Sequence, residues 1–289
     1  MSFKGVRVMS RTGLGVSICV TAAVALSALA ADGSRISFDA IASRVVFDDA
    51  SGRIVGFSSA DGRPVAGEFI NVYPVLSSLG DKEGRETDDR AVSSRTNAWE
   101  RCYRCVNPKL PGLEIIKTYR PCNGGIRRTV EFVRVDSVTN TVYVQLSTEC
   151  RFNPDFKKDA WHFGAGYLGP IKPFPQDGQT RPVNEYRQSS KGLVFTHPNG
   201  NAGSFAHFRT HINGMTVFPW WHSTIGHYRE YGDRLWYMKG GYRMCLGTLD
   251  VRPGKSASYT DQFTFFDGNF YAFFDDVFAK DPDFSAELK

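Results

Sequence analysis

Aromatic, imidazole and carboxylate side chains gather in one segment of the chain, residues 220–236. Within these seventeen residues lie three tryptophans, two tyrosines, two histidines and two carboxylates. Flat aromatic rings stack on the C–H faces of sugars while carboxylates and imidazoles bind hydroxyls, and a mostly apolar surface with a few placed polar groups is typical of binding sites. The alternative is an ordinary β-sandwich core, because large aromatics also supply much of the energy of cores.

Two further stretches add candidate ligand contacts. Trp161 and His162 lie in a segment rich in Gly and Pro. Arg243 offers the bidentate hydrogen bonds that an acidic sugar accepts, and it also fits an ordinary surface arginine. The residues predicted to bind a ligand are Trp161, His162, Trp220, Trp221, His222, Tyr228, Trp236 and Arg243.

A catalytic role would need an acid and a base held at a defined separation across the reacting bond. The candidates for that role are His222, His162, Glu149, Glu230 and Asp233. The sequence supplies these groups but not the distances between them, and Glu230 and Asp233 also fit the solvated rim of a loop. It therefore leaves open whether the protein is an enzyme.

Neither a metal nor a cofactor is expected. Cys102 and Cys105 have the spacing of a zinc or redox pair, but a zinc site would want a second close pair, and Cys122 and Cys150 are scattered. We expect a local disulfide or packing thiols instead. His207 and His211 lack an obvious carboxylate partner, so they are expected to be core or edge histidines.

Residues 1–30 have the pattern of a signal peptide. Lys4, Arg7 and Arg11 precede an uncharged apolar run over 14–26, and the small-x-small triplet 28–30 follows. A membrane anchor is the alternative, but the run is short for a span. We expect a secreted or periplasmic protein whose mature chain is not stably inserted in a membrane.

The charge of the mature chain argues against nucleic-acid binding. Removal of the signal takes away three positive charges from a net +5, which leaves about +2 and no basic cluster. The charge therefore points to a neutral partner, and the aromatic segment 220–236 makes a carbohydrate the expected one.

Behind these residues the pattern is almost entirely β. Short segments rich in Val, Thr, Tyr and Phe alternate with turn clusters, which is typical of stacked antiparallel sheets. The expected strands cover 44–48, 52–57, 113–120, 128–135, 141–146, 192–196, 204–210, 241–249 and 256–266. We predict an all-β fold, a large antiparallel β-supersandwich over the single domain 31–289, with a short C-terminal helix at 270–278. Residues 79–97 are predicted to be a solvated loop, and 157–185 a long functional loop.

The second half of the chain resembles a known fold family. Residues 249–256 read Leu-Asp-Val-Arg-Pro-Gly-Lys-Ser, and a strand ending in Phe265-Phe266-Asp267-Gly268 follows. This pattern resembles the closing strands of galactose-mutarotase-like supersandwich domains, and the resemblance covers roughly residues 36–268. Such domains occur as aldose epimerases and as non-catalytic domains N-terminal to glycoside hydrolase catalytic domains.

The departures from that family separate two hypotheses about function. The resemblance implies a histidine acid and a late glutamate base for an epimerase, but residues 148–152 read Thr-Glu-Cys-Arg-Phe, and after Arg252 the first glutamate is Glu287. We therefore predict an exported carbohydrate-binding protein, non-catalytic alone, for which a glycoside hydrolase catalytic module is an implied partner. The alternative is a sugar-active enzyme (epimerase, hydrolase or lyase) with a His/carboxylate pair. A purely structural domain is the third reading.

Overall fold

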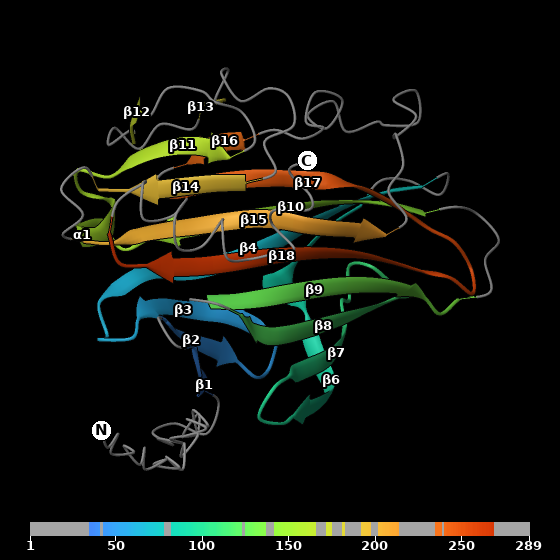
Figure 1. Cartoon of the computed structure of the whole chain (residues 1–289). Helices are drawn as coiled ribbons and strands as arrows, with labels where there is room; N and C mark the ends of the chain where they lie inside the picture. Colours follow the sequence, from blue (N-terminus) through green and yellow to red (C-terminus); the bar gives the residue numbers. More distant parts are fainter. Residues whose placement is uncertain are drawn as a thin grey trace, which may run out of the picture.

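The computed structural model describes residues 35–40, 43–77, 82–122, 125–136, 142–165, 172–174, 181–182, 192–197, 202–213, 235–238 and 240–268. Over these residues the chain forms two antiparallel sheets of nine strands each (Figure 1). Within the described ranges only two short helical turns accompany them, the 3-10 turn η1 (Glu86–Asp88) and α1 (Pro154–Lys157). The predicted all-β class and the double-sheet architecture are confirmed.

The first sheet runs in the order β1-β2-β3-β4-β10-β17-β16-β13, and β5 pairs with β4. Its strands are β1 (Arg35–Ala40), β2 (Ser43–Asp48), β3 (Arg53–Ser59), β4 (Pro64–Ser77), β5 (Lys82–Arg85), β10 (Val142–Phe152), β13 (Arg181–Pro182), β16 (Leu235–Met238) and β17 (Gly241–Val251).

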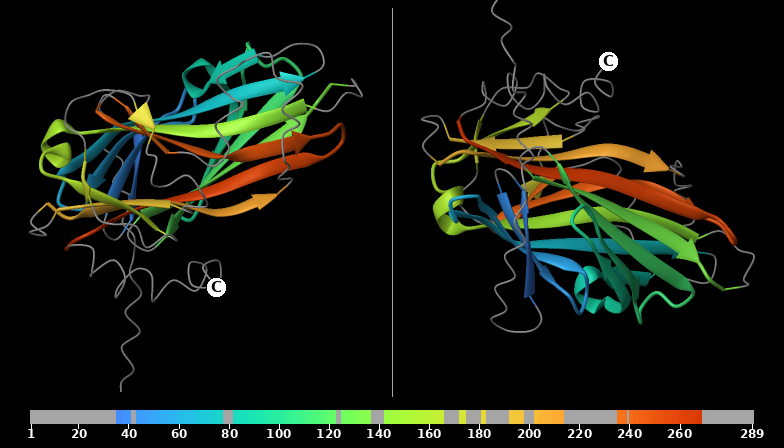
Figure 2. Two further views of the ribbon diagram at one scale, coloured as in Figure 1. Left: turned by 90° about the horizontal axis from the view of Figure 1, so that it is seen from above. Right: turned by 60° about the horizontal axis from the view of Figure 1, so that its bottom comes forward.

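The second sheet runs in the order β12-β11-β14-β15-β18-β9-β8-β7-β6. Its strands are β6 (Arg90–Thr96), β7 (Arg101–Val106), β8 (Leu113–Cys122), β9 (Gly125–Arg134), β11 (Trp161–Ala165), β12 (Lys172–Pro173), β14 (Gly192–Thr196), β15 (Ser204–Asn213) and β18 (Ser256–Phe266). The view from above separates the two layers (Figure 2).

Aromatic side chains fill the space between the sheets. Phe69 of the first sheet contacts Phe263 of the second edge-on, with 4.6 Å between ring centroids. Phe152 meets Phe195 in the same way at 4.6 Å. Edge-to-face pairs of this kind add to the stabilisation that burial gives, so the Phe-rich strands that the sequence predicted hold the two layers together.

The two central strands β9 and β10 differ in how they are buried. Along β9 buried and partly exposed residues alternate, whereas residues 144–150 of β10 are all buried. Alternation is what a strand shows when one face is solvated. Because the even-numbered residues of β10 point into the core, the burial of its odd-numbered residues means that the outward face of the first sheet is screened from solvent there.

Two sequence-based predictions of loops were wrong. Residues 79–97 include β5, η1 and β6, and Glu86 and Asp89 within them are buried. Their charges suggested a solvated loop, but the ionic partner of both is Lys117, distant in the sequence. The region 157–185 contains β11, in which Trp161 pairs with Thr196. Long-range pairing of this kind leaves little local signal.

Several predictions concern residues outside the described part of the chain. These are the signal peptide, the C-terminal helix at 270–278 and most of the segment 220–236. No helix in the described ranges is long and apolar enough to cross a membrane.

Candidate functional site

Glu149 lies at the centre of an ionic cluster on the outward face of the first sheet. Its Oε1 accepts a hydrogen bond from Arg243 Nη2 at 2.6 Å, and its Oε2 accepts one from Arg85 Nη2 at 2.9 Å. The glutamate side chain is 3% exposed, while Arg243 and Arg85 are 26% and 35% exposed. The carboxylate is thus the buried centre of the cluster, and the two guanidinium groups form its solvent-facing rim.

Strand register sets this geometry. Glu149 of β10 lies opposite Ile70 of β4 on one side and Arg243 of β17 on the other, and Arg243 lies opposite Trp236 of β16. Opposed residues in antiparallel strands project from the same face, so the side chains of Glu149 and Arg243 meet on the outward face. Gly241 allows the close approach at the start of β17, since a Cβ there would lie 1.8 Å from the carbonyl oxygen of Cys150.

The cluster has unused hydrogen-bond donors. Both carboxylate oxygens of Glu149 are occupied by guanidinium groups, so the carboxylate acts as an anchor for two arginines. Arg243 Nε is buried and has no hydrogen-bond partner among the described residues. An unsatisfied buried donor costs free energy, and a ligand hydroxyl or carboxylate oxygen is the kind of group that would satisfy it.

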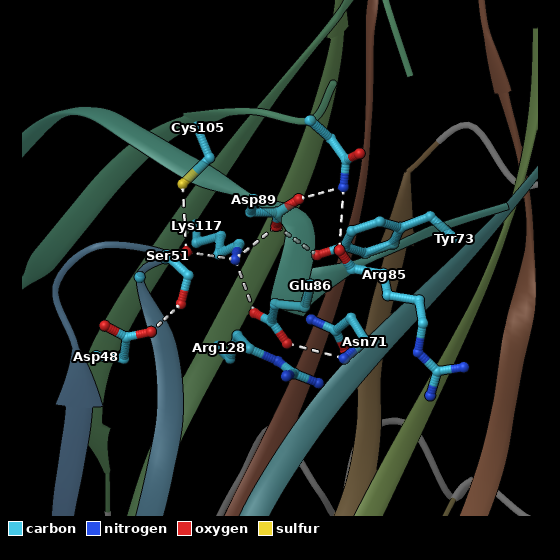
Figure 3. A network of polar contacts seen from close by, with 12 residues as sticks. Asp48, Ser51, Asn71, Tyr73, Arg85, Glu86, Asp89, Cys105, Lys117 and Arg128 are labelled. Carbon is cyan, nitrogen blue, oxygen red and sulfur yellow. Dashed lines mark hydrogen bonds and ion pairs between the residues drawn. The ribbon is translucent and has the colours of Figure 1, made fainter. Parts of the chain in front are cut away.

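A buried polar network lies directly beneath the cluster, and its first part is drawn in Figure 3. Lys117 Nζ lies 2.9 Å from Glu86 Oε1 and 2.7 Å from Asp89 Oδ2. It also donates to the carbonyl oxygen of Ser51 at 2.7 Å. Tyr73 donates its hydroxyl to Asp89 at 3.1 Å. The predicted turn between β2 and β3 therefore supplies a backbone acceptor to a buried ammonium group.

The network continues through the centre of the sandwich. Glu86 Oε2 accepts from the backbone N–H of Asn71 at 2.8 Å, and Asn71 Oδ1 accepts from the hydroxyl of Thr148 at 2.8 Å. Thr148 in turn accepts from Arg128 Nη2 at 2.9 Å. Arg128 forms a bidentate pair with Asp261 at 2.9 and 2.6 Å.

Beyond Asp261 the chain of contacts returns to the first sheet. His207 Nε2 lies 2.8 Å from Asp261 Oδ2, and His207 Nδ1 lies 2.8 Å from the hydroxyl of Tyr242. Because the Asp261 carboxylate accepts, Nε2 carries the proton and Nδ1 accepts from Tyr242. His207 is therefore a hydrogen-bonded core histidine, which agrees with the prediction.

Each residue of the cluster on the outward face is next in the chain to a residue of the buried network. Arg85 precedes Glu86, Glu149 follows Thr148, and Arg243 follows Tyr242. Neighbouring residues of a strand point to opposite faces, and Figure 3 shows the Arg85 side chain reaching away from the network. The network thus holds from inside the three backbone segments that carry the cluster.

Burial and pairing compete in setting the pKa values of the network. Burial alone would raise the pKa of Asp261, but the charge of Arg128 and the hydrogen bond from His207 outweigh it, so the pKa of Asp261 is lowered. Burial lowers the pKa of His207 more than Asp261 raises it. Burial also raises the pKa of Asp89, against the opposing effect of Lys117. The Asp261 end of the network is thus an ionised carboxylate beside a neutral imidazole.

The structure brings some of the predicted residues together and separates others. Glu149 and Arg243 form an ion pair, and the backbone of Trp236 lies opposite Arg243. Trp161 and His162 lie on β11 of the second sheet, so they are not cross-strand neighbours of Glu149 and Arg243. The remaining candidates fall outside the described residues, namely Trp220, Trp221, His222, Tyr228, Glu230 and Asp233.

Sequence reasoning missed Arg85 and the whole buried network. Arg85 belongs to the stretch that was predicted to be a loop, and Lys117, Arg128 and Asp261 are charged residues within strands, where the sequence alone does not reveal their partners. The sequence of β8 does contain an indication, because Lys117 lies at an alternate position between the apolar residues Ile115 and Tyr119, which are buried. A charge at a core position of that pattern requires a partner.

Cys102 and Cys105 do not form the local disulfide that was one of the two expectations. They lie on β7, three residues apart, and therefore point to opposite faces. Burial raises the pKa of Cys105 to about 12, and its thiol donates to the carbonyl oxygen of Ser51. Cys105 is a packing thiol, the second of the two expectations.

Comparison with known proteins gives a result for structure but not for sequence. No protein-family model matches the chain, and neither does any curated protein. A galactose mutarotase-like protein from Lactobacillus casei superimposes with a TM-score of 0.53 at 10% identity, over 80% of this chain and 100% of that one. The chain has the galactose mutarotase-like fold.

Two further structures place this fold in different contexts. A galactose mutarotase related enzyme from Lactobacillus acidophilus matches with a TM-score of 0.51 at 9% identity, over 82% of this chain and 98% of that one. A GH36 α-galactosidase from Geobacillus stearothermophilus matches with a TM-score of 0.50 at 12% identity, over 81% of this chain but 41% of that one. The galactose mutarotase-like fold therefore occurs both as a whole chain and as part of a larger enzyme.

Proposed function

We propose that the protein binds carbohydrate on the outward face of the first sheet, over Glu149 and Arg243, and that it is not catalytic by itself. The observation that carries this proposal is the pairing of Glu149 with two partly exposed arginines. A carboxylate whose two oxygens both accept charge-assisted hydrogen bonds is poorly placed to exchange a proton with a substrate. The guanidinium groups instead offer N–H donors to sugar oxygens.

The fold supports a sugar as the ligand. Structures that share it include a galactose mutarotase related enzyme and an α-galactosidase. Fold alone does not determine function, so the weight rests on the site. Trp236 is the cross-strand partner of Arg243. Hydrogen-bond donors next to an aromatic residue are the composition expected of a carbohydrate site.

Calorimetric titration of the mature protein with neutral and acidic oligosaccharides tests the proposal, with a parallel assay for chemical change in the sugar. We expect saturable binding with unchanged sugar, and at least a tenfold loss of affinity in Arg243→Met. Arg252→Met is the matched control, because Arg252 is an exposed arginine just beyond the other end of β17 that pairs with Asp250. Conversion of the sugar that is lost in Glu149→Gln would replace the binding function with an enzymatic one.

We also propose that the protein is exported. The support is the pattern of residues 1–30, a positive start followed by an apolar run and a small-x-small triplet. Expression of the full chain in a bacterial host, followed by intact-mass measurement of the periplasmic fraction, tests it. A protein that stays in the cytoplasm at full mass would contradict export.

A further inference from the structure

A second surface with unpartnered binding groups lies on the β6–β7 hairpin, at the edge of the second sheet. Trp99 in its turn is 70% exposed. Of the four large hydrophobic side chains that are exposed among the described residues, three (Val92, Trp99 and Val106) belong to this hairpin. Val106 lies opposite Arg90, at the end of the hairpin away from the turn, so Trp99 is the large exposed group that the turn itself presents.

The turn that carries Trp99 is held in one conformation. Asn97 Oδ1 accepts hydrogen bonds from the backbone N–H groups of Trp99 at 2.9 Å and Glu100 at 2.8 Å. The backbone N–H of Asn97 also donates to the carbonyl oxygen of Glu100 at 2.9 Å. A preformed turn loses little conformational freedom on binding, so the indole is presented to a ligand at low entropic cost.

The residue next to Trp99 anchors two arginines. Glu100 Oε1 accepts from Arg95 Nη2 at 2.6 Å, and its Oε2 accepts from Arg120 Nε at 2.9 Å and Nη2 at 2.6 Å. Arg95 is 73% exposed and Arg120 is 61% exposed. Two cations share one carboxylate, so this group has one excess positive charge, and it offers further N–H donors but no free carboxylate oxygen.

We propose that the Trp99 turn is an accessory site for an acidic sugar, a uronic acid unit of a longer glycan. The sugar ring would stack on the indole, and its carboxylate would bind the N–H groups of Arg95 and Arg120 that Glu100 leaves unused. Trp99 is the residue before Glu100, which holds both guanidiniums. A site of one aromatic ring and two cations suits one sugar ring, whereas a protein interface buries about 800 Å² on each partner. The choice of ligand class rests on the proposed carbohydrate function, but the residues differ from those of the Glu149 cluster.

The experiment compares a trigalacturonate with the neutral trigalactoside as probes in calorimetric titrations of the mature protein. We expect Trp99→Ala and Arg120→Gln each to weaken binding of the acidic probe at least tenfold and to leave the neutral probe unchanged. Arg120→Lys keeps the charge but loses the bidentate geometry, and we expect an intermediate loss. Glu149→Gln should leave the acidic site on the turn intact.

Arg104→Met is the matched control, because Arg104 is an exposed arginine on β7 of the same hairpin that pairs with Glu114. Equal losses in Arg104→Met and Arg120→Gln would mean general charge attraction and would overturn the proposal. Unchanged binding of the acidic probe in Trp99→Ala would overturn it as well. If Arg243→Met loses binding of the neutral probe but keeps binding of the acidic probe, the two sites are independent. If the acidic probe does not depend on Trp99 while the neutral probe depends on Arg243, the Trp99 proposal is wrong and the proposed function stands.

Discussion

The Glu149 cluster and the Arg128–Asp261 pair contain the same kinds of charged groups and lie on opposite sides of β10, where Glu149 faces outward and its neighbour Thr148 contacts Arg128. Around Arg128 every charged partner is buried, and both the arginine and the aspartate are 0% exposed. Around Glu149 the carboxylate is buried but both arginines reach solvent. The comparison shows how one strand supports a closed ionic network on its inner side and an open one on its outer side.

The energetic roles of the two clusters differ for the same reason. A buried ion pair gains little net stability over an apolar core, yet removal of one partner leaves an uncompensated charge and is strongly destabilising. At a partly exposed cluster, water replaces a lost partner and the cost is small. The inner network therefore specifies which strands face each other, whereas the outer cluster remains free to exchange water for a ligand.

The largest expected effect is that of Arg128→Met. It leaves Asp261 ionised in the core without its bidentate partner and removes the donor to Thr148, so we expect the free energy of unfolding to fall by about 3–5 kcal/mol. Urea denaturation followed by circular dichroism measures it. Arg104→Met, which breaks an exposed pair, should change the free energy of unfolding by less than about 1 kcal/mol; similar losses in both variants would remove the distinction between inner and outer charges.

Thr148→Val tests whether the inner network supports the outer cluster. The valine keeps the volume but removes the hydroxyl that links Arg128 to Asn71, and we expect a loss of about 1–3 kcal/mol in the free energy of unfolding. Because Glu149 is the next residue, we also expect weaker sugar binding although no surface group has changed. Reduced stability with wild-type sugar affinity would mean that the network does not position the cluster.

The pH dependence of stability sharpens the comparison further. Burial holds the pKa of His207 below its ordinary 6.5, so the folded chain resists a proton that the unfolded chain accepts. The stability linked to His207 is therefore complete above pH 6.5 and is lost as the pH falls from 6.5 toward the folded pKa, with a slope of at most about 1.4 kcal/mol per pH unit. His207→Gln keeps a donor for Asp261 and an acceptor for Tyr242, and urea denaturation at several pH values should show a smaller slope below pH 6.5 in this variant.

Glu149→Gln should have the smallest effect on stability. Arg85 and Arg243 reach water, so we expect the free energy of unfolding to fall by about 1 kcal/mol or less. Sugar affinity should fall more visibly, because the amide no longer anchors both guanidiniums. A loss of several kcal/mol in urea denaturation would instead place Glu149 with the inner network.

Most of the fold could be predicted from the sequence, and the reasons are local. The strand pairs 44–48 with 52–57 and 113–120 with 128–135 are visible because their residue types and turns encode hairpins. Strand β6 could not be predicted, because six of its seven residues are exposed and it therefore has no apolar alternation. Strand β11 could not be predicted, because it pairs with β14, which is distant in the sequence.

The candidate site was predictable in part. The sequence by itself determined the all-β architecture, and it singled out Glu149, Arg243 and Trp236 as chemically suitable residues. Only the tertiary structure decided that Glu149 and Arg243 form an ion pair, that Arg85 completes their cluster, and that Lys117, Arg128 and Asp261 belong to the core. Local propensities act over a few residues, whereas these contacts join positions that only strand register and the packing of two sheets bring together.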